Sequence, residues 1–126
     1  MTKKGRILVA ESCGIVSKDI ETLLEDWGYE SYDVVRSDHD ALKLIQEAHP
    51  NLVIIDKDLR GQSGGEAIAQ QINTQYHVPV ILLTDWLTQE WTHQIEKLKS
   101  FYCLSKPFDC SELHHLIDET MVAWHN

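Results

Sequence analysis

The chain has 126 residues, of which 43% are hydrophobic and 25% are charged. This size and apolar content predict one folded domain over residues 1–126 and argue against a disordered chain. The formal charge of −9, from 20 acidic and 11 basic residues, argues against nucleic acid or an anionic membrane as a direct partner, and favours divalent cations and basic protein surfaces.

The remaining composition predicts a cytoplasmic protein. No apolar run approaches membrane-spanning length, and the apolar stretch behind the basic N-terminus is too short for a signal peptide. The three cysteines, Cys13, Cys103 and Cys110, are an odd number, which favours reduced thiols over a disulfide framework.

The first half of the chain alternates strand and helix patterns. Residues 7–10 are a short apolar run of the kind that forms a buried strand, and residues 16–27 carry an apolar stripe of helical spacing that ends at a glycine. Residues 29–35 form a weaker, more polar pattern that suits an edge strand. Ser37 can cap a second helix, which must stop before Pro50.

The middle of the chain continues the alternation with stronger strand signals. Residues 51–55 and 78–83 are continuous apolar runs rich in β-branched residues, which suit strands covered on both faces. Residues 65–76 lie between these runs and carry helical spacing. This order predicts two parallel strands joined by a helix.

The last third of the chain adds two helices around one strand. Thr88 can cap the first helix, and residues 101–104 form the fifth strand candidate. Asp109 and Glu112 make a capping-box pattern, and the helix that follows runs through Trp124.

Five strand–helix units in succession predict an α/β fold. We expect a flavodoxin-like, doubly wound, five-stranded parallel sheet of order 2-1-3-4-5 with helices on both faces. Ligands of such sheets bind at the carboxyl ends of the strands, near the point where the strand order reverses. Every strand except the second ends in polar residues, which are Glu11-Ser12, Asp56, Thr84-Asp85 and Ser105-Lys106. In the expected order these polar ends face one crevice.

Asp56 is the predicted centre of the chemistry in this crevice. A carboxylate can accept a phosphoryl group as a nucleophile. A second acid, Glu11, favours a bound Mg²⁺, and the Thr84 hydroxyl and the Lys106 ammonium can hold phosphoryl oxygens. Asp56 alone could equally be a turn cap. The convergence of the other three strand ends favours the chemical role.

Over nearly its whole length, the chain resembles the receiver domain of two-component response regulators, with its chemotaxis-regulator-like fold. The order and spacing of the matching segments are specific, although each segment is weak alone. These segments are residues 7–11, 52–56 with Leu59 and 61–64 behind them, 79–84, and 104–108.

The resemblance implies that Asp56 accepts a phosphoryl group from a sensor histidine kinase, a phosphotransfer protein or a small phosphodonor, and thereby switches a signalling output. It implies a Mg²⁺ cofactor bound by Glu11, Asp56 and the main-chain carbonyl of Asp58. It also implies that Thr84 and Lys106 contact the phosphoryl group. Such a protein takes part in its own phosphorylation and dephosphorylation and is not a dedicated enzyme.

The resemblance also implies a cis peptide bond between Lys106 and Pro107, a geometry that only X-Pro bonds adopt cheaply. The output is expected in a downstream effector or in an output domain outside this sequence. In the family it runs through the fourth helix, fifth strand and fifth helix, and this face is also the expected surface of any homodimer.

Three positions depart from the family pattern. Ser12 stands where a second acid is usual, and a neutral hydroxyl is a poorer Mg²⁺ ligand than a carboxylate. Asp85 stands where a very small residue is usual, and its charge either repels a phosphoryl group or replaces the acid missing at Ser12. Cys103 stands where the family has a switching aromatic residue, and Tyr102 beside it should point to the opposite face of the strand.

Two other functions are consistent with parts of this pattern. In a pseudo-receiver, Ser12 and Asp85 would have disabled phosphorylation, and the same fold would serve as a protein-interaction module. Residues 56–58 also match the Asp-x-Asp motif of haloacid-dehalogenase-type phosphotransferases. That motif follows the first strand of a longer chain, whereas here it follows the third strand, so the receiver hypothesis is preferred.

Overall fold

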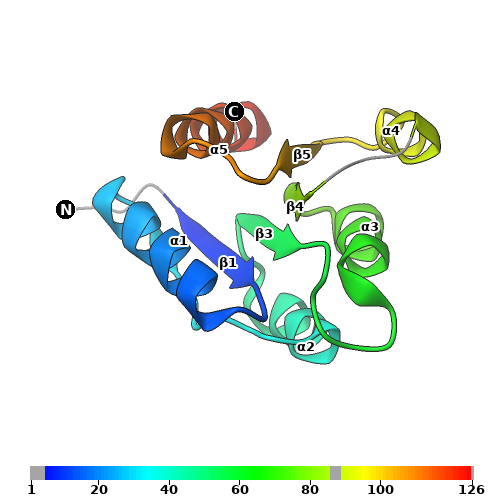
Figure 1. Cartoon of the computed structure of the whole chain (residues 1–126), viewed down its shortest axis with the longest axis horizontal. Coiled ribbons are helices and arrows are strands. Elements are labelled where there is room, and N and C mark those ends of the chain that lie inside the picture. The colour runs from blue at the N-terminus through cyan, green and yellow to red at the C-terminus, as the bar shows by residue number, and fades with distance from the viewer. Residues whose placement is uncertain (1–4, 86–88, 126) are drawn as a thin grey trace.

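The computed structural model describes residues 5–85 and 89–125, with the side chains of residues 89–91 and 123–125 left out of the description. In this part of the chain, strands and helices alternate strictly (Figure 1). The elements are β1 (Arg6–Ala10), α1 (Gly14–Asp26), β2 (Glu30–Ser31), α2 (Asp38–Ala48), β3 (Leu52–Asp56), α3 (Gly64–Tyr76), β4 (Val80–Thr84), α4 (Gln89–Ile95), β5 (Phe101–Ser105) and α5 (Cys110–His125).

The strands form one parallel sheet in the order β2-β1-β3-β4-β5, which confirms the predicted α/β fold. Figure 1 shows helices on both sides of this sheet. The strand order reverses between β1 and β3, so the carboxyl ends of β1, β3 and β4 lie next to one another. This arrangement brings the polar strand ends of the sequence together.

Alternate residues of each central strand pack into two separate cores. In β3, Leu52 and Ile54 face α1 and α5, whereas Val53 and Ile55 face α2 and α3. All four side chains are fully buried. Burial of one such side chain contributes about 1.5–3 kcal/mol to folding, which explains why these runs form the rigid base of the site.

The second strand is shorter than the sequence predicted. The expected strand over residues 29–35 is reduced to Glu30–Ser31, and beyond it an isolated bridge joins Val35 to Ala10. The prediction was too long because this polar edge segment pairs with β1 alone and packs one face incompletely. A main-chain hydrogen bond of 3.0 Å from Glu11 N to Val35 O still ties the segment to the end of β1.

The predicted boundaries of the second helix are confirmed. Ser37 caps α2, because its hydroxyl oxygen accepts a 3.2 Å hydrogen bond from Asp40 N, and the helix stops at Ala48, before Pro50. The predicted cap of α4, Thr88, lies outside the described residues. Within the described ranges, no helix is both long and apolar enough to cross a membrane.

Two smaller predictions are also confirmed. The peptide bond between Lys106 and Pro107 is cis. The thiols of Cys13, Cys103 and Cys110 are all free.

Candidate functional site

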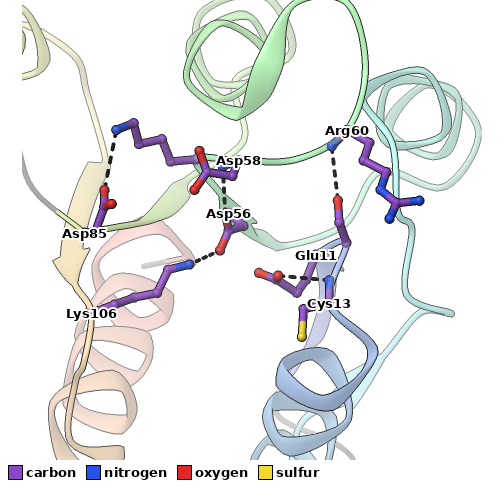
Figure 2. Close-up of polar contacts among 9 residues, drawn as sticks. Glu11, Cys13, Asp56, Asp58, Arg60, Asp85 and Lys106 are labelled. Atoms are coloured by element: carbon purple, nitrogen blue, oxygen red, sulfur yellow. Dashed lines mark hydrogen bonds and ion pairs between the residues drawn. The ribbon is translucent and has the colours of Figure 1, made fainter.

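Asp56 is the last residue of β3, and only 2% of its surface is exposed. The main-chain N–H of Asp58 donates a 2.7 Å hydrogen bond to its Oδ1, and the Lys106 ammonium donates to its Oδ2 (Figure 2). Both carboxylate oxygens are therefore held in place. The partners come from the connection after β3 and from the end of β5, as the strand-end argument predicted.

Gly65 explains how the first turn of α3 can approach the end of β3. A Cβ atom at this position would lie 1.9 Å from the main-chain oxygen of Asp56 and 2.7 Å from that of Lys57. The Gly65 N–H donates a 2.9 Å hydrogen bond to the Lys57 carbonyl. Only glycine permits this contact, which fixes the direction in which the chain leaves the acceptor strand.

Glu11 follows β1 and is buried next to Asp56, with 5% of its surface exposed (Figure 2). Its Oε1 accepts a 3.1 Å hydrogen bond from Cys13 N. Its Oε2 is buried and has no hydrogen-bond partner within the described residues. Burial, and then the adjacent Asp56 carboxylate, raise the pKa of Glu11 to about 7.

Unlike the pKa of Glu11, the pKa values of Asp56 and Lys106 shift in the directions that favour the charged form of each group. Burial raises the pKa of Asp56, but the neighbouring Glu11 carboxyl and Lys106 ammonium outweigh this effect and hold the pKa below its usual value. Burial likewise lowers the pKa of Lys106, but the nearby acids outweigh it and raise the pKa. The pair therefore consists of a charged Asp56 and a charged Lys106.

Thr84 ends β4 and is fully buried beside the acceptor strand. Its carbonyl accepts a 2.7 Å hydrogen bond from the Lys106 main-chain N–H, and it lies in register with Ser105 of β5. The structure thus joins the ends of β4 and β5. Glu11, Asp56, Thr84 and Lys106 all gather at one edge of the sheet, as the sequence predicted.

Ser12 has a role that the sequence did not reveal. Its hydroxyl donates a 3.3 Å hydrogen bond to the Arg36 carbonyl and accepts a 3.1 Å bond from Arg60 N, and Arg36 Nη1 donates to the Ser12 carbonyl at 3.3 Å. Figure 2 shows Arg60 on the Glu11 side of Asp56. Ser12 therefore ties the connection after β1 to those after β2 and β3.

Asp85 directly follows β4 and lies on the other side of Asp56 from Glu11, the residue before Ser12 (Figure 2). Its carboxylate Oδ1 is 3.5 Å from Lys57 Nζ. Asp85 therefore does not take the position of the acid missing at Ser12. The other alternative, repulsion of a phosphoryl group by its charge, stays a prediction. Sequence reasoning did not single out Lys57.

Cys103 and Tyr102 of β5 point to opposite faces of the sheet, as predicted. Cys103 packs with the α2 and α3 side, and Tyr102 packs with the α1 and α5 side. Burial, and then the charge of Glu66, raise the pKa of the Cys103 thiol to about 11. The thiol is therefore protonated at neutral pH, and it is a small apolar side chain where the family has a switching aromatic residue.

The residues of the crevice fit a bound Mg²⁺. In the described ranges, no three His, Cys, Asp or Glu side chains form a metal-binding group. Mg²⁺, however, commonly uses only one or two carboxylates, together with water and phosphate oxygens. Glu11 and Asp56 supply two carboxylates at this edge of the sheet. The buried, unpartnered Oε2 of Glu11 and its raised pKa are what a cation would relieve.

Comparison with known proteins agrees with this geometry. A model of the response regulator receiver domain family matches residues 7–118. The chain is 26% identical over 121 residues to the regulatory protein AtoC of Escherichia coli K12, which covers 96% of this chain and 26% of AtoC. It is 27% identical over 108 residues to the transcriptional regulatory protein PdtaR of Mycobacterium tuberculosis H37Rv, which covers 86% of this chain and 52% of PdtaR.

The chain thus spans about half or less of the length of these relatives. Among solved structures, the signal receiver domain of an HD domain-containing protein from Pseudomonas fluorescens Pf-5 matches with a TM-score of 0.84 and 26% identity. The match covers 96% of this chain and 97% of that domain.

Proposed function

The chain belongs to the response regulator receiver domain family, and we propose from this premise that Asp56 is the phosphoacceptor of a two-component phosphorelay. The donor is a sensor histidine kinase or a phosphotransfer protein. The observation that best supports the proposal is the state of Asp56, which is buried, ionised and held by Lys106 beside a second acid, Glu11.

The proposed reaction uses the Asp56 carboxylate as the nucleophile. A carboxylate oxygen attacks the phosphorus atom and forms the new O–P bond. The P–N bond to the donor histidine breaks, and its electron pair returns to the imidazole nitrogen. Thr84 and Lys106 hold the oxygens of the transferred group. In the dephosphorylation step, water attacks phosphorus, the O–P bond to Asp56 breaks, and inorganic phosphate leaves.

Glu11, Asp56 and the main-chain carbonyl of Asp58 would hold the Mg²⁺ in this proposal. The bound ion neutralises the charge that the phosphoryl group brings into the crevice. The Ser12 hydroxyl already makes two hydrogen bonds to main-chain atoms, so it is at best a weak ligand and serves to tether the loops.

The output of the switch is proposed to lie in a downstream effector or an output domain. The face of α4, β5 and α5 is its proposed route and the proposed surface of any homodimer. The protein would act as a cytoplasmic switch that takes part in its own phosphorylation and dephosphorylation, rather than as a dedicated enzyme.

Incubation with acetyl phosphate and Mg²⁺, followed by intact mass measurement, tests this proposal. We expect an adduct of about 80 Da, the mass of one phosphoryl group. The adduct should be absent in Asp56→Asn and without Mg²⁺, and should persist in the matched control Asp58→Asn. Absence of the adduct with acetyl phosphate, phosphoramidate and a histidine kinase alike would contradict the proposal and favour a pseudo-receiver.

A further inference from the structure

The connection between β3 and α3 passes the N-terminus of α2 before it enters α3. Residues 60–63 of this connection are all exposed, so burial does not fix their position. Asp38, the first residue of α2, contacts the connection twice. Its main-chain N–H donates a 2.8 Å hydrogen bond to the Arg60 carbonyl, and its Oδ2 accepts a 3.1 Å hydrogen bond from Ser63 N. Asp38 therefore holds both ends of this exposed stretch.

The Asp38 carboxylate also fills the space beside Gly61. A Cβ atom at Gly61 would lie 2.0 Å from Oδ1 and 2.3 Å from Oδ2 of Asp38, and the φ of Gly61 is +140°. Only glycine permits so close an approach of main chain to carboxylate. Asp38 and residues 61–63 also line a cavity of about 440 Å³, together with residues of α2 and α3. The connection thus borders a cavity, and the Asp38 carboxylate is a contact that fixes it there.

The same connection carries a residue of the proposed Mg²⁺ site. Asp58 donates its main-chain N–H to Asp56 Oδ1, and its carbonyl is proposed to bind Mg²⁺. Two residues later, the Arg60 N–H donates a 3.1 Å hydrogen bond to Ser12 Oγ, and Asp38 holds the Arg60 carbonyl. Figure 2 shows Asp58 and Arg60 on this connection, beyond Asp56. The peptide groups between Asp56 and Arg60 are thus held at both ends.

We propose that Asp38 is a positioning residue for the Mg²⁺ site. By holding the connection at residues 60 and 63, it keeps the Asp58 carbonyl in the orientation that binds Mg²⁺. The proposal rests on the proposed function, in which Asp56 accepts the phosphoryl group and Mg²⁺ binds beside it. Asp38 itself contacts neither group in this proposal. Its removal should therefore change the affinity for Mg²⁺ and leave the maximal rate of phosphorylation unchanged.

Mg²⁺ titrations of the full chain, followed by NMR of its main-chain amides, test the proposal without any phosphoryl transfer. We expect Asp38→Ala to raise the Kd for Mg²⁺ by about tenfold, the low end of the range for an outer partner of a metal ligand. Asp38→Asn should stay within about twofold of the parent chain, because its amide oxygen can still accept the hydrogen bond from Ser63 N. Hydrogen exchange at Ser63 N should be slow in the parent chain and in Asp38→Asn, and faster in Asp38→Ala.

Asp40→Ala is the matched control for the loss of charge. Asp40 is an exposed acid in the same first turn of α2, so this variant removes the same charge from the same end of the helix. Its Kd for Mg²⁺ should equal that of the parent chain. If Asp40→Ala and Asp38→Asn raise the Kd as much as Asp38→Ala does, the effect is one of negative charge alone, and the positioning role is overturned.

Gly61→Ala is a second test, which leaves the Asp38 side chain in place and serves even if Asp38→Ala does not fold. The added Cβ would displace the carboxylate from the connection, so the Kd for Mg²⁺ should rise in this variant too. In the Asp38→Ala background the same substitution should change the Kd less than it does in the parent chain, because the carboxylate is gone. A Gly61→Ala chain with the parent Kd would overturn the proposal.

The outcomes separate this proposal from the proposed function. Rates of adduct formation from acetyl phosphate at saturating Mg²⁺ should agree between the parent chain and Asp38→Ala within about twofold. An unchanged Kd in Asp38→Ala, with the adduct still formed on Asp56, overturns the positioning role and leaves the phosphoacceptor intact. A lower stability or maximal rate at an unchanged Kd indicates a structural role and also overturns it. If the parent chain forms no adduct and binds no Mg²⁺, the proposed function itself fails, and the positioning role with it.

Discussion

Replacing Glu11 by Gln should reduce the pH dependence of the free energy of unfolding. Burial and the neighbouring Asp56 raise the pKa of Glu11 from an ordinary value of 4.5 to about 7. Between these values, the folded protein holds a proton that the unfolded chain has released. The stability that Glu11 contributes is therefore complete below about pH 4.5 and is lost as the pH rises through 7.

The size of this effect follows from the two pKa values. One pKa unit corresponds to about 1.4 kcal/mol, so the Glu11 contribution should change by about 2–3 kcal/mol between pH 5 and pH 8. The Gln side chain introduces an offset of its own, but that offset does not depend on pH. The informative quantity is the difference between the two proteins at pH 5, compared with the same difference at pH 8.

Urea denaturation with EDTA present, followed by tryptophan fluorescence, measures this quantity. The free energy of unfolding of Glu11→Gln minus that of the parent chain should be about 2–3 kcal/mol more favourable to the variant at pH 8 than at pH 5. Glu25→Gln is the control, because it makes the same substitution at an exposed position of α1. It should show the same difference from the parent chain at both pH values. Adding Mg²⁺ at pH 8 should stabilise the parent chain more than Glu11→Gln. An equal difference at both pH values would refute the argument that Glu11 is a buried, proton-binding carboxyl.

Four further substitutions test the site. Lys106→Met should raise the pKa of Asp56, because an ammonium that stabilises its charge is removed; carbon NMR of the Asp56 carboxyl measures this, and an unchanged value would count against the pair. Ser12→Ala should lower the free energy of unfolding by about 1–2 kcal/mol through two lost hydrogen bonds, and urea denaturation that shows no loss would argue against the tether. Gly65→Ala should lower the free energy of unfolding by about 2–3 kcal/mol, because its Cβ would meet the Asp56 carbonyl. Gly64 has open space around it, so Gly64→Ala should lower it by only about 1–2 kcal/mol, because of the positive φ. The reverse order of their melting temperatures would contradict this reasoning.

The apolar strands and their order could be predicted because they depend on hydrophobicity and chain topology. The run around Val53 and Ile54 is fully buried on both faces, and such runs leave a clear signal in the sequence. The predicted strand order then placed Glu11, Asp56 and Lys106 together, because each of them lies at the carboxyl end of a strand. The edge strand was predicted too long because pairing along an edge depends on main-chain contacts rather than on apolar side chains.

Polar contacts between distant loops could not be predicted. The hydrogen bond from Arg60 N to Ser12 joins residues 48 apart in the sequence, and the pair between Lys57 and Asp85 joins residues 28 apart. Such contacts have no period and need no particular composition. The charge of Asp85 was visible in the sequence, but its ion pair with Lys57 was not.

The central claim is that Asp56 carries the phosphoryl group, and chemical trapping of the modified residue tests it most directly. Sodium borohydride reduces an aspartyl phosphate to homoserine, which peptide mass spectrometry can locate. After incubation with acetyl phosphate and Mg²⁺, we predict homoserine at position 56. Homoserine at position 58 or 85, or a phosphoryl adduct that yields no homoserine at all, would contradict the account.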